Sequence, residues 1–141
     1  MKEIRLQIPA HADYIDIVRV CLFGIASKLS FSYEDIEDMK VAVSEACNNA
    51  VLHGSPSLQH NNIDISFESR DTSMTIKISN KGTSFPHVDA LVNASPLPAT
   101  DISELPVGGL GIYLMQALMD EVNVETIDNI TIVTLVKYLT V

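Results

Sequence analysis

Helix-like and strand-like patterns occur in separate blocks along this chain, and this order restricts the possible folds more than any other feature. A short alternating segment, Ile4–Ile8, comes first and ends at Pro9. Two helical segments follow, one from His11 to about Leu29 and one from Ser32, which has the form of a capping residue, to His53. Because the two helices are consecutive, a repeated βα unit and a doubly wound dinucleotide-binding fold are disfavoured.

The remaining strands are predicted to form hairpins. Asn62–Glu68 and Met74–Ser79 alternate polar and apolar residues and are joined by a short polar loop. Val122–Thr126 and Ile130–Tyr138 form a second such pair across an Asp-Asn turn. Strands that arrive as hairpins favour a largely antiparallel sheet.

A long connection precedes the last predicted helix. Thr83–Val107 contains four prolines and a short candidate helix at Val88–Asn93. Connections of this length are usually lids or binding segments. A helix is predicted next, at Gly109–Met119. The whole order predicts one α+β domain over residues 1–141. The predicted architecture is a two-layer α/β sandwich, with helices packed on one face of a mixed, mostly antiparallel sheet.

Composition excludes several functional classes. The chain has 141 residues and a net charge of −9, so it is large enough for one core, and direct nucleic-acid binding is disfavoured. No secretory signal or membrane-spanning segment is recognised, which predicts a cytoplasmic protein. The two cysteines, Cys21 and Cys47, have the wrong number and spacing for zinc and are expected to be buried free thiols.

Three polar residues share one face of the second helix. Glu45, Asn49 and His53 are each four residues apart, so they form a single line on a helix that is otherwise apolar inward. A carboxylate, an amide and an imidazole in line can deprotonate a hydroxyl, hold a hard cation and contact a phosphate. The alternative is an ordinary exposed line.

Two glycine-containing segments are candidate ligand sites. Gly108, Gly109 and Gly111 open the last helix, where backbone N–H groups and the helix dipole favour an anion; a flexible joint or close packing is the alternative. No Lys or Arg occurs from Gly82 to Val136, so this is not a P-loop, and bound phosphates would depend on backbone groups and a metal ion. Asn80-Lys81-Gly82 is either a simple turn or an acceptor for an adenine amino group.

Together these motifs resemble the Bergerat-type ATP-binding fold of the GHKL superfamily, which includes gyrase, Hsp90, histidine kinases and MutL. Glu45–Ala50 resembles its N-box, Asn80–Gly82 its first glycine box and Gly108–Gly111 its second. More narrowly, Val41–Val51 and Gly108–Met115 resemble the anti-sigma factor serine kinases of the RsbW/SpoIIAB type, and the likeness covers nearly the whole chain.

The resemblance implies a dimeric cytoplasmic kinase that binds a sigma factor and uses Mg-ATP to phosphorylate an anti-anti-sigma factor on serine. Glu45 would be the general base, and Asn49 would ligate Mg²⁺. The second glycine box would hold the phosphates, through Gly108, Gly109, Leu110, Gly111 and Ile112. His53 would contact a phosphate or simply cap its helix. Arg19 would contact both protein partners, unless it belongs to a solvated helix face.

Two departures from the family pattern affect the nucleotide base. Asn80 stands where the family has Asp, so its oxygen accepts a hydrogen bond without charge, and weaker ATP binding or looser base choice is expected. Gly82, the glycine of the same box, matches the family pattern. Thr131 is the candidate threonine of the adenine site, although the residues around it differ from the pattern. The alternatives are a catalytically impaired module that only sequesters its partners, and an ATPase acting on something other than a protein.

Overall fold

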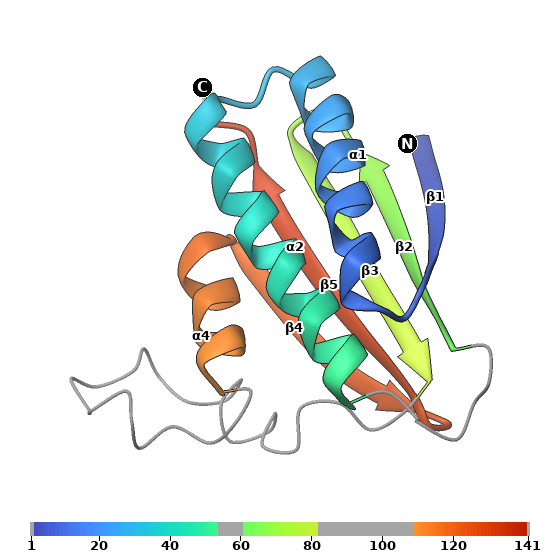
Figure 1. Cartoon of the computed structure of the whole chain (residues 1–141). Coiled ribbons are helices and arrows are strands. Elements are labelled where there is room, and N and C mark those ends of the chain that lie inside the picture. Colours follow the sequence, from blue (N-terminus) through green and yellow to red (C-terminus); the bar gives the residue numbers. More distant parts are fainter. Residues whose placement is uncertain (1, 54–60, 82–108, 141) are drawn as a thin grey trace.

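The structure is a computed structural model that describes residues 2–53, 61–81 and 109–140 (Figure 1). The elements follow the predicted order, with strands and helices as follows: β1 Lys2–Pro9, the 3-10 turn η1 Ala12–Tyr14, α1 Ile15–Lys28, α2 Tyr33–His53, β2 Asn62–Ser69, β3 Ser73–Lys81, α4 Gly109–Leu118, β4 Glu121–Ile127 and β5 Ile130–Tyr138. The predicted connection at Thr83–Val107 and its short helix at Val88–Asn93 lie outside the described residues.

The described strands form one sheet in the order β1-β2-β3-β5-β4. The helices α1, α2 and α4 cover one face of it (Figure 1), which confirms the two-layer α+β architecture. The sheet was expected to be mixed, but all four described pairings are antiparallel. The helices α1 and α2 run in opposite directions, so the chain returns to the end of the sheet where β1 finished, and β2 runs antiparallel to β1. In the same way, α4 and β4 run in opposite directions, so β5 starts where β3 ends and runs antiparallel to it (Figure 1).

The signals for turns and caps operate as the sequence predicts. Ser32 Oγ accepts a hydrogen bond from the Asp35 backbone N–H at 3.1 Å, which caps α2. Asp128 and Asn129 have φ of 52° and 64°, as a tight two-residue hairpin turn requires. The first helix departs from the prediction. His11 caps the separate turn η1, and α1 begins only at Ile15.

The core lies between the helices and the sheet. The inward positions predicted on α2 are all buried: Ile36, Met39, Val43, Cys47 and Ala50. They pack in one cluster with residues from four strands, including Ile8, Phe67, Ile76 and Leu135. Each fully buried side chain of this size stabilises the fold by about 1.5–3 kcal/mol. None of the helices in the described part of the chain is long and apolar enough to cross a bilayer.

Both cysteines are free thiols, but they differ in burial. Cys47 is fully buried in α2, whereas Cys21 is half-buried on α1. Burial raises the pKa of the Cys47 thiol to about 12, although the charge of Arg19 opposes the shift. Cys47 therefore stays neutral at physiological pH and serves as a small apolar core residue.

Candidate functional site

The two motifs that stand some sixty positions apart in the sequence meet where α2 and α4 pack together. A Cβ atom built on Gly111, in the first turn of α4, would lie 2.8 Å from Asn49 Nδ2 and 3.1 Å from Glu45 Oε2. Only a glycine fits that position without displacing these side chains. The carboxylate and amide of α2 therefore face the glycine segment of α4.

The Asn49 side chain is held in a defined orientation. It is 4% exposed, and its Nδ2 donates a hydrogen bond to the Glu45 backbone carbonyl at 2.9 Å. Since the amide nitrogen is committed to α2 itself, the amide oxygen is the atom left to ligate a hard cation. The Glu45 carboxylate is half-buried one turn earlier on the same face. The amide oxygen of Asn49 and the carboxylate of Glu45 are thus the groups on this face of α2 that could hold a hard cation or accept a proton.

His53 completes the polar line at the end of α2. Its Nε2 is buried and has no hydrogen-bond partner among the described residues. Buried polar nitrogens nearly always form a hydrogen bond, so a ligand or a neighbouring group is expected to bond to this atom. A phosphate contact is consistent with this, and a cap on the helix end remains the alternative.

The two residues predicted for the base lie next to each other under the last turns of α2. Asn80 and Thr131 are directly opposed on β3 and β5, and both point into the helix side of the sheet, 5% and 0% exposed. Asn80 Nδ2 lies 3.5 Å from the Ala50 carbonyl and 3.3 Å from the Lys81 carbonyl. Among the described residues the amide oxygen has no donor assigned to it, so it is the candidate acceptor. The hydroxyl groups of Thr131 and Thr126 are 3.2 Å apart.

The residues of the second glycine box differ in their surroundings. Gly109 is the first residue of α4, and Leu110 is 41% exposed. Ile112 is 1% exposed and belongs to the core, so only its backbone remains to contact a ligand. The first N–H groups of an α-helix have no partner within the helix, so those of α4 could donate hydrogen bonds to a phosphate. Gly82 and Gly108 lie outside the described residues.

Arg19 lies in the groove between α1 and α2 and is not a freely solvated side chain. Its Nη1 donates to Ser44 Oγ at 2.9 Å, it forms an ion pair with Asp16, and its side chain is 36% exposed. Ser44 Oγ in turn donates to the Lys40 carbonyl at 2.7 Å. No sequence pattern assigned a role to Ser44. Its role as a bridge to Arg19 depends on how the two helices pack.

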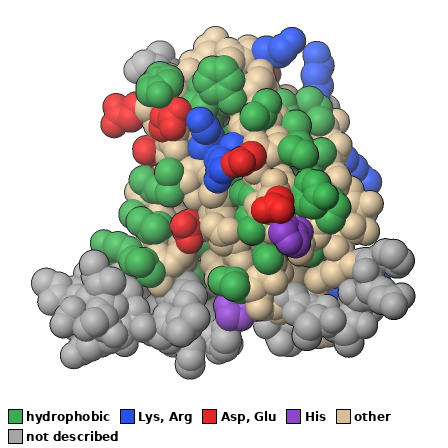
Figure 2. All heavy atoms as spheres, in the orientation of Figure 1, with side chains coloured by type: hydrophobic (Ala, Val, Ile, Leu, Met, Phe, Trp, Pro, Cys, Tyr) green, Lys and Arg blue, Asp and Glu red, His purple; other side chains and the backbone are tan. Residues whose placement is uncertain are grey.

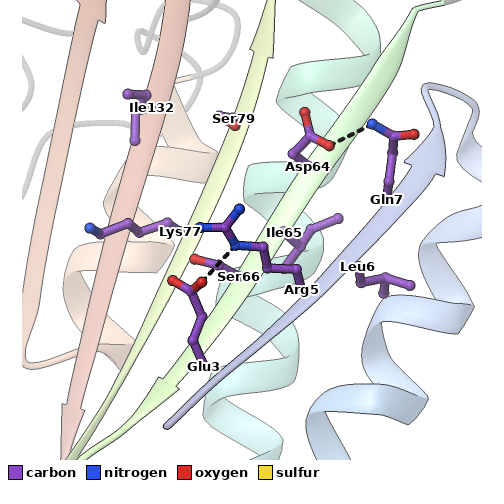
Figure 3. Close-up of a pocket in the computed structure, with 10 residues that line it drawn as sticks. All are labelled: Glu3, Arg5, Leu6, Gln7, Asp64, Ile65, Ser66, Lys77, Ser79 and Ile132. Carbon is purple, nitrogen blue, oxygen red and sulfur yellow. Dashed lines mark hydrogen bonds and ion pairs between the residues drawn. The ribbon is translucent and has the colours of Figure 1, made fainter. Parts of the chain in front are cut away.

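The opposite face of the sheet carries a hollow of about 730 Å³ that contains none of the predicted site residues (Figure 3). Side chains from β1, β2, β3 and β5 line it, including Arg5, Lys77 and Asp64. A hydrogen bond from Arg5 holds the pKa of Glu3 below its ordinary value, despite the opposing effect of burial. The positive charge of Arg5 is thus partly neutralised by Glu3. Because none of the predicted site residues line this hollow, the candidate site is the one between α2 and α4.

Comparisons with known proteins identify the family to which this chain belongs. The model of the histidine kinase-like ATPase domain matches residues 8–137. Serine-protein kinase RsbW of Bacillus licheniformis is 41% identical over 137 residues, which cover 96% of this chain and 85% of that protein. RsbW of Bacillus subtilis is 37% identical over the same share of both chains. RsbW of Staphylococcus aureus is 39% identical over 96% of this chain and 86% of its own.

Solved structures show the same fold at low sequence identity. The RsbU and RsbW domains of a Mycobacterium tuberculosis protein superpose with a TM-score of 0.72 at 18% identity, covering 99% of this chain and 33% of that one. The catalytic domain of the histidine kinase ThkA gives a TM-score of 0.54 at 15% identity, covering 99% of this chain and 97% of that one. The family model over residues 8–137, together with this fold, defines a histidine kinase-like ATPase domain. Within that class, the chain belongs to the family of RsbW serine-protein kinases.

Proposed function

We propose that this chain is an ATP-dependent protein-serine kinase and an anti-sigma factor. It sequesters a sigma factor, and it phosphorylates and so inactivates an anti-anti-sigma factor on serine. The approach of Gly111 to Glu45 and Asn49 carries the proposal, because it joins a base, a cation ligand and a phosphate-binding helix start in one place. The kinase name of relatives that are 37–41% identical supports the same reaction.

Each group has a distinct part in the phosphoryl transfer. Glu45 takes the proton from the attacking serine hydroxyl. The serine oxygen bonds to the γ-phosphorus, the bond between that phosphorus and ADP breaks, and ADP leaves. Asn49 would hold Mg²⁺ through its amide oxygen, and the ion would neutralise phosphate charge. The first turn of α4 offers backbone N–H groups to the phosphates, through Gly109, Leu110, Gly111 and Ile112, with Gly108 preceding them. His53 Nε2 donates to a phosphate oxygen.

The adenine lies against the β3–β5 pair in this proposal. Asn80 accepts from the exocyclic amino group, Gly82 allows the base to approach, and Thr131 lies beside it. The geometry that supports this arrangement is the direct opposition of Asn80 and Thr131 on the buried side of the sheet.

The exposed surface of the helix layer supports a role in binding other proteins. Figure 2 shows hydrophobic side chains interspersed with charged ones over this face. The exposed apolar residues of η1 and α1 are Tyr14, Ile17, Val20 and Phe23. Arg19 emerges among them and would pair with acidic groups of the sigma factor and of the anti-anti-sigma factor. The proposed partners act on transcription, so the proposed setting is the cytoplasm.

A homodimer of this single domain forms part of the proposal. The edge strand β1 and α1 enclose an apolar groove of about 610 Å³ lined by residues that include Ile4, Val20, Cys21 and Phe67. Ile4 is 52% exposed and Val20 is 72% exposed. Apolar side chains beside β1, which is the edge strand among the described residues, suit a second copy of the chain.

The direct test is incubation of the purified chain with labelled ATP, Mg²⁺ and the anti-anti-sigma protein encoded in the same cell. Label on a serine of that protein, absent when Mg²⁺ is chelated, is the expected result. Binding of the partner without any transfer would contradict the kinase and leave only sequestration.

Asn80→Asp is expected to tighten ATP binding about three- to tenfold, because charge-assisted hydrogen bonds are roughly twice as strong as neutral ones. The melting temperature should fall by a few degrees, since the introduced carboxylate cannot donate to the Ala50 carbonyl as the Asn80 amide does. Titration calorimetry measures the ATP affinity of both chains. Asn123→Asp adds the same charge on exposed β4 and should leave the affinity unchanged. Unaltered or weaker ATP binding by Asn80→Asp would rule out the proposed contact.

A further inference from the structure

Lys137 is the sole Lys or Arg in residues 82–141, and its side chain points into the molecule. It lies on β5 in the same alternation as Thr131, Val133 and Leu135, which are buried on the helix side of the sheet. The Lys137 side chain is 12% exposed. A largely buried ammonium group needs partners with the opposite charge or free carbonyl groups.

The partners of Lys137 come from two helices. Its Nζ donates a hydrogen bond of 2.6 Å to the carbonyl of Leu118, the last residue of α4. The carboxylates of Asp35 and Asp38, near the start of α2, lie 3.9 Å and 4.0 Å from the same nitrogen. The contact with the last carbonyl of α4 and the one with Asp35, in the first turn of α2, also complement the dipoles of the two helices.

Lys137 thereby fixes one end of α4 against α2, while the glycine segment contacts α2 at the other end. The two helices run in opposite directions along each other (Figure 1). Leu118 lies about 10 Å along α4 from Gly111, and Asp38 lies about 16 Å along α2 from Asn49. The turn after α4 is also bound to β5, through Asp120 and the backbone of Val136 and Tyr138.

The fit at the glycine end leaves little tolerance for movement of α4. The space at Gly111 is so limited that an added Cβ would lie within 2.8 Å of Asn49 Nδ2. A sub-ångström slide of α4 along α2 would therefore change the distance between the phosphate-binding N–H groups and the groups on Asn49 and Glu45.

We propose that Lys137 is a positioning residue for the nucleotide site: it sets the axial position of α4 on α2 and thereby the alignment of the phosphate-binding turn with Asn49. The inference rests on the proposed function, because it concerns affinity for ATP. Lys137 does not itself take part in the reaction, whose proposed base and cation ligand lie on α2. Its loss is therefore expected to affect KM much more than kcat.

The test compares Lys137→Met with Lys77→Met, each of which removes one lysine from the sheet. Lys77 is exposed on the opposite face of the sheet, in the hollow lined by Arg5 and Asp64 (Figure 3). Lys137→Met is expected to raise the KM for ATP about tenfold, change kcat less than threefold, and speed hydrogen exchange in α4 about tenfold without nucleotide. Lys77→Met is expected to match the unmodified chain in all three.

All measurements are made well below the midpoint temperature of unfolding, so differences in global stability do not affect the comparison. A folded Lys137→Met chain with KM within twofold of the unmodified chain would overturn the role of Lys137. If that variant does not fold, Lys137→Gln keeps a donor and is expected to raise KM by a smaller factor, and an unchanged KM would overturn the role equally. An unmodified chain that binds no ATP would instead overturn the proposed function, and with it this inference.

Discussion

Gly111→Ala is expected to weaken Mg-ATP binding about 10- to 100-fold while the chain still folds. The new methyl group would meet Asn49 Nδ2 at 2.8 Å and Glu45 Oε2 at 3.1 Å. Asn49 would have to turn, which breaks its hydrogen bond to the Glu45 carbonyl and moves the proposed cation ligand. Forcing a methyl group into packed surroundings costs about 1–3 kcal/mol, which corresponds to this loss of affinity. Titration calorimetry measures it.

The chain offers a matched control for this change. Gly24 is also a helical glycine, on α1, but an added Cβ there meets nothing within 4 Å. Gly24→Ala should leave ATP affinity unchanged and should stabilise the fold by up to about 1 kcal/mol, because alanine favours a helix more than glycine. Equal ATP affinities for the two alanine variants would show that α4 is not part of the nucleotide site.

Glu45→Gln is expected to lower kcat for phosphorylation of the partner protein about 10²- to 10⁴-fold, the usual contribution of a positioned general base. Glutamine has nearly the same volume but takes up no proton, so ATP affinity should stay within about threefold. The loss should appear in kcat and in kcat/KM together, since the group acts in the transition state. Steady-state transfer of label to the partner measures both parameters.

Glu34→Gln is the control for the loss of a carboxylate from the same helix. Glu34 is exposed in the first turn of α2, far from Gly111, and its replacement should leave kcat unchanged. If Glu45→Gln retains full activity, the base must be another group, and the interpretation of α2 as the catalytic helix fails.

Local signals in the sequence were sufficient for most of the fold. The periodicity of α2 identified its buried residues correctly, and Ser32 and the Asp-Asn turn at 128–129 marked element ends that the structure confirms. These features depend on neighbours within a few residues, so one sequence is enough to predict them. The mixed sheet was a wrong expectation for the described strands, because strand direction depends on how many elements lie between two strands.

The candidate site was predictable as motifs but not as contacts. The sequence placed Glu45 and Asn49 on one face, and the structure adds that this face meets Gly111. The bridge from Arg19 to Ser44 and the contacts of Lys137 join elements distant in the chain. Helical or strand periodicity tells which face a residue occupies but does not tell which side chain will lie opposite it.

Replacing Mg²⁺ by paramagnetic Mn²⁺ in the ATP complex tests the location of the phosphates most directly. Nuclear magnetic resonance of the labelled chain records which amide signals the bound ion broadens. The account predicts strong broadening at Asn49 and Gly111, with the signals of Gly24 and Lys77 unaffected. Broadening centred on Arg5 and Lys77, across the sheet from α2, would contradict it.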